Sequence, residues 1–156
     1  MIAPVDAVRK PQVLLAEDNQ DLRELLAEIM VALGTDVEAV PDGGRFLVSI
    51  AAHYREGHTF ARVDLIVTDV GMPVCSGLDV LGALRAVGWG TPAIVITGLP
   101  TPVARARAAR LNATLLSKPL DLALFQGTVL ELLASRPADG DVSVSSRHGQ
   151  PWIPPS

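Results

Sequence analysis

The sequence predicts an α/β sandwich with a parallel sheet, because short apolar runs alternate five times with stretches of helical periodicity. The runs are rich in β-branched residues and have the length of buried strands. The third run, Leu65-Ile66-Val67-Thr68, ends directly in Asp69. Right-handed crossovers between parallel strands then bring all strand ends to one edge of the sheet. In chain order, strands are expected at 12–16, 35–40, 64–68, 93–97 and 113–117.

The first two helices are expected from apolar stripes and from the residues at their ends. Five apolar residues follow Asn19 at helical spacing, and Gly34 is a suitable C-terminal stop. The turn 41–44 precedes a second apolar stripe that starts near Arg45 and includes Tyr54. The segment 53–62 is then expected to be a polar, irregular extension.

The last three helices are expected to begin at 78, 102 and 122. The third carries leucines at helical spacing over 78–87. Thr101 followed by Pro102 is a helix start with a proline at the first position, so the fourth is expected to run to about 111. Asp121 is expected to cap a fifth helix that ends near Ser135.

The two ends of the chain differ in composition from residues 12–135, which are expected to form a single domain. Residues 1–11 read as a flexible leader. Residues 136–156 are rich in Pro, Ser and Gly and are expected to be a disordered tail. Within this tail, Trp152 lies among prolines at 151–155. That pattern occurs in peptide ligands, and simple disorder is the plainer interpretation.

Charge and cysteine content narrow the classes of function. The net charge of −4 argues against unspecific binding to nucleic acid or to anionic membranes. Cys75 is the only cysteine, so an internal disulfide is impossible, and this suits a reducing cytoplasm. Packing of a small apolar residue in its loop is the plain reading of Cys75. With no signal-peptide pattern and no run long enough to cross a bilayer, a cytoplasmic protein without a membrane partner is expected.

Polar side chains follow four of the expected strands and should meet at the shared edge, where open α/β sheets bind their ligands. Glu17 and Asp18 follow the first strand, Asp69 the third, Thr97 ends the fourth and Lys118 follows the fifth. Three converging carboxylates repel one another, which raises the pKa of at least one of them. A hard cation such as Mg²⁺ relieves this repulsion. The ionised Asp69 could then attack a phosphoryl donor, with the other groups neutralising the phosphoryl oxygens.

These residues carry a family resemblance over roughly residues 11–135. The motifs are Leu14-Leu15-Ala16-Glu17-Asp18-Asn19, Thr68-Asp69-Val70-Gly71-Met72-Pro73 with Gly77, Ile96-Thr97-Gly98 and Ser117-Lys118-Pro119. Together, and in this order, they resemble the receiver domain of bacterial two-component response regulators, of the stand-alone type. The resemblance implies a flavodoxin-like (βα)5 three-layer sandwich with strand order 2-1-3-4-5.

The resemblance also implies a phosphorylation-dependent switch or relay shuttle that is not an enzyme apart from its own phosphorylation and slow dephosphorylation. A histidine kinase or phosphotransfer protein would phosphorylate Asp69. Thr97 and Lys118 would contact the phosphoryl group. Mg²⁺ is implied as the cofactor, held by Glu17, Asp18, Asp69 and the Gly71 carbonyl.

The implied partners are the kinase and a downstream protein or second copy that binds the fourth helix, fifth strand and fifth helix. Arg105, Arg107 and Arg110 on the fourth helix could belong to such a surface or be a solvated face, and direct DNA binding is not expected.

Four features depart from the pattern of the resembling family. Leu115 stands where such domains carry an aromatic switch residue, so the usual coupling between Thr97 and that residue cannot operate in the same form. Neither Gly71 nor Leu99 has a side chain that could orient an attacking water, which predicts slow hydrolysis. The 53–62 connection is long, and no output domain follows the fifth helix.

Three other functions compete with the phosphorylated receiver. A Mg²⁺-dependent phosphohydrolase with an aspartyl-phosphate intermediate would need a second acid where Gly71 stands. A nucleotide-binding protein would need glycines in the first strand–helix turn, which is acidic. A receiver that signals by contact alone would explain Leu115, although Lys118 and the acidic residues argue against it. Thr97 could also serve only local hydrogen bonds.

Overall fold

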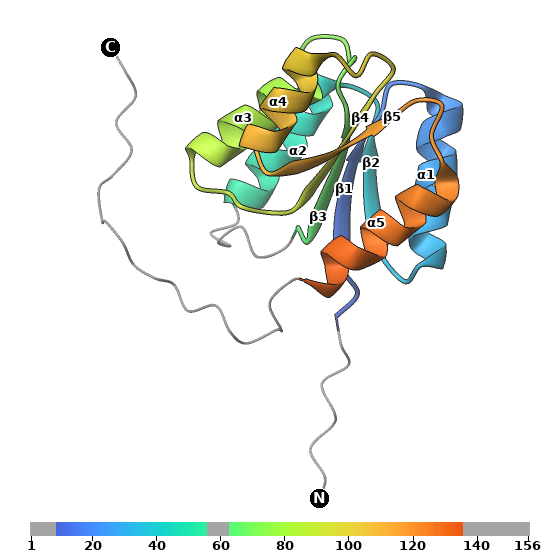
Figure 1. Cartoon of the computed structure of the whole chain (residues 1–156). Coiled ribbons are helices and arrows are strands. Elements are labelled where there is room, and N and C mark those ends of the chain that lie inside the picture. Colours follow the sequence, from blue (N-terminus) through green and yellow to red (C-terminus); the bar gives the residue numbers. More distant parts are fainter. Residues whose placement is uncertain (1–8, 56–62, 136–156) are drawn as a thin grey trace, which may run out of the picture.

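Five strands and five helices alternate along the chain in the computed structural model, which describes residues 9–55 and 63–135 (Figure 1). None of the helices in these ranges is long and apolar enough to cross a membrane. The strands are β1 (Gln12–Ala16), β2 (Asp36–Val40), β3 (Leu65–Asp69), β4 (Ala93–Thr97) and β5 (Ala113–Ser117). The helices are α1 (Gln20–Ala32), α2 (Gly43–Arg55), α3 (Gly77–Ala86), α4 (Pro102–Arg110) and α5 (Leu122–Ala134).

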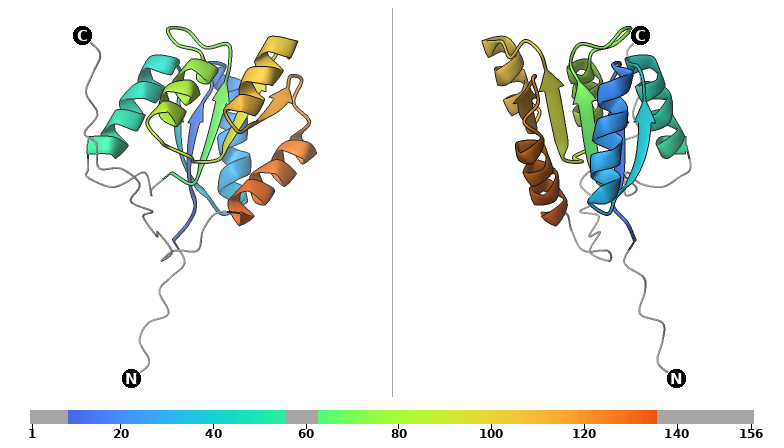
Figure 2. Two further views of the ribbon diagram at one scale, coloured as in Figure 1. Left: turned by 60° about the vertical axis from the view of Figure 1, so that its left-hand side comes forward. Right: turned by 90° about the vertical axis from the view of Figure 1, so that its right-hand side faces the viewer.

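The strands form one parallel sheet in the order β2-β1-β3-β4-β5, which confirms the expected fold class and strand order. Helices α1 and α5 cover one face, and α2, α3 and α4 cover the other (Figures 1 and 2). Because all strands run in the same direction, their carboxyl ends lie along one edge. The chain enters the loops that carry the polar residues at this edge.

Alternating residues of the central strands feed two separate cores. Leu14 of β1 packs with α2, α3 and α4, whereas its neighbours Val13 and Leu15 pack with α1 and α5. All five residues of β3 and of β4 are buried, as the unbroken apolar runs predict for strands covered on both faces. The largest buried side chains are Trp89, Phe46 and Phe125. Burial on both faces holds the end of β3, and with it Asp69, in a rigid frame.

Helix α2 differs from its expected bounds at both ends. It begins at Gly43 rather than Arg45, because Asp42 caps it: the Asp42 carboxylate accepts the Arg45 backbone N–H at 2.7 Å. It continues through His53 to Arg55, so the expected irregular extension is wrong for these residues. The remaining part of that extension, 56–62, lies outside the described residues.

The other boundaries shift by a residue or so. Strand β2 starts at Asp36 because the hydroxyl of buried Thr35 donates to the Met30 carbonyl at 2.7 Å and closes the end of α1. Asp64 precedes β3, and its carboxylate accepts the backbone N–H of Gln12 at 2.7 Å. Residues 1–8 of the expected leader and the expected tail 136–156 lie outside the described residues.

Candidate functional site

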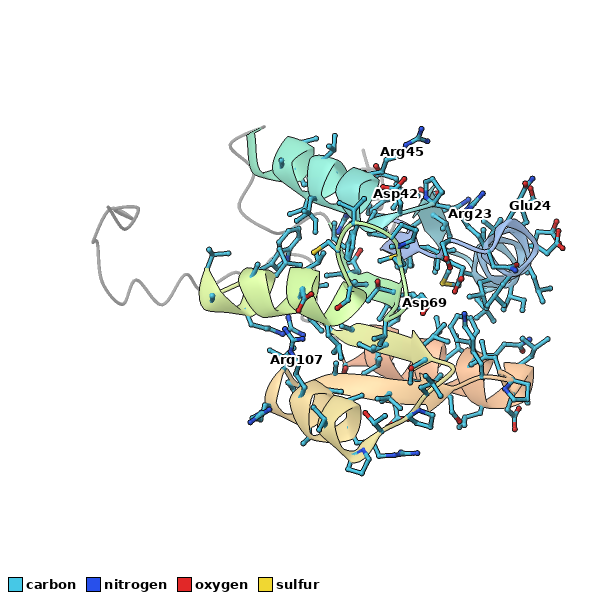
Figure 3. All side chains as sticks on the ribbon, turned by 90° about the horizontal axis from the view of Figure 1, so that it is seen from above. Arg23, Glu24, Asp42, Arg45, Asp69 and Arg107 are labelled. Atoms are coloured by element: carbon cyan, nitrogen blue, oxygen red, sulfur yellow. The ribbon has the colours of Figure 1, made fainter. Side chains whose placement is uncertain are left out.

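Three carboxylates meet at the carboxyl edge of the sheet. Asp69 is the last residue of β3 and is buried, Glu17 follows β1 and is fully buried, and Asp18 is exposed. One carboxylate oxygen from each of the three lies within 4.8 Å of the others. Figure 3 views the molecule from above and places Asp69 near the middle, between Arg23 and Asp42 on one side and Arg107 on the other. The structure therefore brings together the acidic residues that the sequence singled out.

Lys118, directly after β5, supplies the positive charge of the site. Its Nζ lies 2.5 Å from Asp69 Oδ2 and 3.4 Å from Glu17 Oε2. Its backbone N–H donates to the Thr97 carbonyl at 2.8 Å, so the pairing of β4 with β5 fixes where the side chain begins. The peptide bond to Pro119 is cis. A single ammonium group thus faces both buried carboxylates.

Burial, more than repulsion, sets the protonation of Glu17. Loss of solvent raises the pKa of the Glu17 carboxyl to about 7, and the charge of Asp69 adds to the increase. The backbone N–H of Asn19, 3.1 Å from Glu17 Oε1, and the Lys118 charge act in the opposite direction. The expectation of one raised pKa is confirmed, with desolvation as its main cause.

The ammonium of Lys118 responds to the same surroundings. Partial burial lowers the pKa of Lys118, but the hydrogen bond and the charge of Asp69 outweigh it, so the net shift is upward. Lys118 therefore stays charged at neutral pH. Its positive charge is a permanent part of the site.

The donor set fits a hard divalent cation. Oxygen atoms alone face the cluster, as Mg²⁺ prefers. Glu17 Oε2 is buried and accepts no hydrogen bond from any residue in the described ranges, although Lys118 lies near it. A buried carboxylate oxygen without a hydrogen bond is costly unless a cation or water satisfies it. Glu17, Asp18 and Asp69 could thus hold a metal ion.

Gly71 and Thr97 lie on either side of the Asp69 chain segment. The Gly71 backbone N–H donates to Asp69 Oδ1 at 2.8 Å, so each Asp69 oxygen has a separate partner. Thr97 is buried, and its hydroxyl oxygen accepts the Leu99 backbone N–H at 3.1 Å. This is the local hydrogen bond considered for Thr97, and it leaves the hydroxyl proton available to another acceptor.

Leu115 lies in β5 opposite Val95 of β4. It is half-buried and packs against the core between the sheet and α2, α3 and α4. The position therefore faces the layer that contains α4, and the side chain there is aliphatic.

Two glycines, Gly43 and Gly77, let the backbone approach closely around the site. A Cβ on Gly77 would lie 2.3 Å from the Asp69 carbonyl oxygen, so only glycine fits where α3 meets the end of β3. A Cβ on Gly43 would lie 2.2 Å from the Cys75 carbonyl oxygen, where the loop after β3 meets α2. Gly77 was visible as part of a motif, whereas Gly43 was read as a turn residue.

The loop after Asp69 is strained at Val74. Val74 has a φ of 73°, which is rare for a β-branched residue, and the N–H of Cys75 donates to the Pro73 carbonyl across it at 2.9 Å. Its side chain is 89% exposed. Because Gly43 and Gly77 allow this loop to pack against α2 and β3, the strained turn is held in place.

Two supporting residues lacked a functional signal in the sequence. Asn19 caps α1 by accepting the Leu22 N–H at 2.9 Å, and its own N–H binds the Glu17 carboxylate. Arg23 of α1 donates to the Glu17 carbonyl at 3.0 Å. The capping role of Asn19 follows from its place before a helix. The contact of Arg23 depends on how α1 folds back over the first loop.

Comparison with known proteins shows which family has this arrangement. The family model described as the response regulator receiver domain matches residues 13–129. This chain belongs to the receiver domain family. Receiver domains are signalling switches that interact with histidine kinases or phosphotransfer proteins and bind Mg²⁺ at an acidic pocket, and here Glu17, Asp18 and Asp69 form such an acidic group.

The similar proteins are longer than this receiver. The transcriptional regulatory protein TctD of Salmonella typhimurium is 31% identical over 123 residues, which are 78% of this chain and 51% of TctD. The transcriptional regulatory protein PrrA of Mycobacterium tuberculosis is 31% identical over 140 residues, 89% of this chain and 55% of PrrA. The chain thus spans about half the length of the curated relatives it matches.

Solved receiver structures share the fold. The chemotaxis protein CheY4 of Vibrio cholerae aligns with a TM-score of 0.66 and 25% identity, covering 80% of this chain and 99% of that one. The receiver domain of the Francisella response regulator 1452 aligns with a TM-score of 0.69 and 24% identity, covering 80% and 98%. The latter likeness concerns the fold alone.

Proposed function

We propose that this receiver accepts a phosphoryl group on Asp69 from a phosphohistidine of a histidine kinase or phosphotransfer protein. The observation that carries the proposal is the contact between Lys118 Nζ and Asp69 Oδ2 at 2.5 Å, beside two further carboxylates. A buried carboxylate that only stabilised the fold would not need two more acidic groups next to it. A carboxylate that receives a phosphoryl group needs a cation and a lysine at this place.

In the proposed reaction a carboxylate oxygen of Asp69 attacks phosphorus as the P–N bond to the donor histidine breaks. The leaving ring nitrogen takes up a proton from solvent and becomes neutral imidazole, and Asp69 becomes an acyl phosphate. Lys118 already lies beside the acceptor and would neutralise the phosphoryl oxygens. The Thr97 hydroxyl would donate its free proton to one of them. Mg²⁺ held by Glu17, Asp18, Asp69 and the Gly71 carbonyl would supply further positive charge.

The proposed route of the signal leads through β4 and β5 to the outer helices. The Thr97 carbonyl binds the Lys118 N–H, so a change at either side chain acts on the other strand. Leu115, four residues after Leu111 at the end of α4, packs toward the α4 layer. A partner protein or second copy would then bind the surface of α4, β5 and α5. An aliphatic Leu115 calls for a shift of packing in place of the rotation of an aromatic ring.

The test is intact mass spectrometry after incubation with Mg²⁺ and acetyl phosphate. We expect one phosphate adduct on the wild-type chain and none on Asp69→Asn. Asp79→Asn is the matched control, because Asp79 is an exposed aspartate near the start of α3 that pairs with Arg107. It should keep the adduct. No adduct on the wild type with acetyl phosphate or with a phosphorylated histidine donor would overturn the proposal in favour of a receiver that signals by contact alone.

A further inference from the structure

The outer face of α5 is apolar along its whole length. Its inner face packs Phe125 and Val129 into the core, and its outer face exposes five residues without charge. Leu124 is 56% exposed and Leu130 is 49% exposed. We call this surface the α5 strip, and it consists of Ala123, Leu124, Gly127, Leu130 and Ala134.

The shape and charge of the α5 strip suit an apolar ligand. At the helical pitch, Leu124 and Leu130 lie on either side of Gly127. No described atom lies within 4 Å of a Cβ placed on Gly127, so nothing in the described ranges covers the middle of the strip. Glu131 is the only charged residue in Leu122–Ala134. A surface helix normally carries charged residues on its outer face, so this composition indicates a contact surface.

The sequence that continues from α5 contains an apolar segment of matching character. Ser135 caps α5, and the chain goes on through Pro151-Trp152-Ile153-Pro154-Pro155. Trp152 and Ile153 supply large apolar side chains with few rotatable bonds. The three prolines have no N–H, so this segment can lie on an apolar face while burying few unpaired donors.

The tether is long enough for the segment to reach the strip of its own chain. Helix α5 has 13 residues and is therefore about 20 Å long. The 17 residues from Ser135 to Trp152 can extend to roughly 60 Å. Such a short tether gives an effective concentration in the millimolar range, so even a weak contact is occupied. A second copy must reach the strip from free solution and must also overcome the loss of translational freedom.

We propose that residues 151–155 dock on the α5 strip of the same chain and cover it. The docked segment occupies α5, which belongs to the surface proposed above for a partner or second copy. It thereby limits access to that surface. The contact does not require phosphorylation of Asp69, so its failure and the failure of the phosphoryl-acceptor proposal are distinguishable.

The test uses tryptophan fluorescence of the full chain. The chain has two tryptophans, and Trp89 is 2% exposed, so subtracting the signal of Trp152→Phe isolates Trp152. We expect Trp152 to show blue-shifted emission and protection from acrylamide. Leu130→Glu places a carboxylate in the strip and should lower the ratio of docked to undocked chain by roughly tenfold or more, which removes the protection.

The matched control is Val48→Glu, an equally charged change on α2, where Val48 is 69% exposed on the other side of the sheet. It should leave the protection of Trp152 unchanged. Fully solvent-like Trp152 in the wild type, or protection that survives Leu130→Glu, would overturn the proposal. Protection that increases with protein concentration would also overturn it, because the occupant would then be a second copy.

Discussion

The close contact between α3 and the end of β3 makes Gly77 the most sensitive small residue near the site. A Cβ at this position would lie 2.3 Å from the Asp69 carbonyl oxygen and 2.4 Å from Thr68 Oγ1. The first distance is about 1 Å shorter than the 3.4 Å at which ordinary contact begins. Thr68 and Asp69 are buried in the middle of the sheet, so they cannot move aside freely.

Gly77→Ala should therefore destabilise the chain. Overpacking in a rigid core costs about 1–3 kcal/mol. Alanine recovers up to about 1 kcal/mol by its better helix propensity, and less at the first helical position. We expect a net loss of about 2 kcal/mol in the free energy of unfolding, measured by urea denaturation. The displaced Asp69 backbone should also slow phosphorylation by acetyl phosphate.

Gly82→Ala in the same helix is the matched control. A Cβ on Gly82 would lie 3.6 Å from an Arg107 side-chain nitrogen, which is an ordinary contact. This change should stabilise the chain by up to about 1 kcal/mol through helix propensity. If Gly77→Ala were as stable as the wild type, or if both variants lost the same stability, the inferred close contact would be wrong.

Three further predictions concern charge and turnover. The folded-state pKa of Glu17 is about 7 against an ordinary 4.5, so the folded chain binds more protons in this interval. Without metal, stability should thus fall by up to about 3 kcal/mol as pH rises from about 4.5 to about 7, and urea denaturation of Glu17→Gln should lack this slope. Arg107→Ala removes the 2.8 Å ion pair with Asp79, which is largely exposed, so urea denaturation should show a loss below about 1 kcal/mol that shrinks with salt. The phosphoryl group on Asp69 should be lost slowly in Mg²⁺ buffer, because Gly71 offers no side chain to orient water; a half-life of seconds by mass spectrometry would contradict this.

The sequence by itself determined the fold class and the edge where the polar residues gather. Strand–helix alternation, apolar periodicity and caps such as Thr101 and Asp121 are properties of neighbouring residues, so they can be read locally. Placing Asp69 and Lys118 after parallel strands was enough to put them at one edge. Their roles remain predictions, although the geometry now gives each role a distance.

The bounds of α2 show where local reading fails. Gly43 and its neighbour Gly44 have the composition of a turn, and capping by Asp42 competes with that reading. The helix forms there because the loop at Cys75 packs directly against Gly43, a contact between residues 32 positions apart. Sequence patterns do not contain such contacts.

Only the tertiary structure decided the electrostatics of the site. Lys118 and Asp69 are 49 residues apart in sequence, and their hydrogen bond exists because β4 lies between β3 and β5 in the sheet. The same packing buries Glu17 completely and raises the pKa of its carboxyl. Residue types and strand ends are encoded locally, whereas burial and distance depend on segments that meet only in the folded chain.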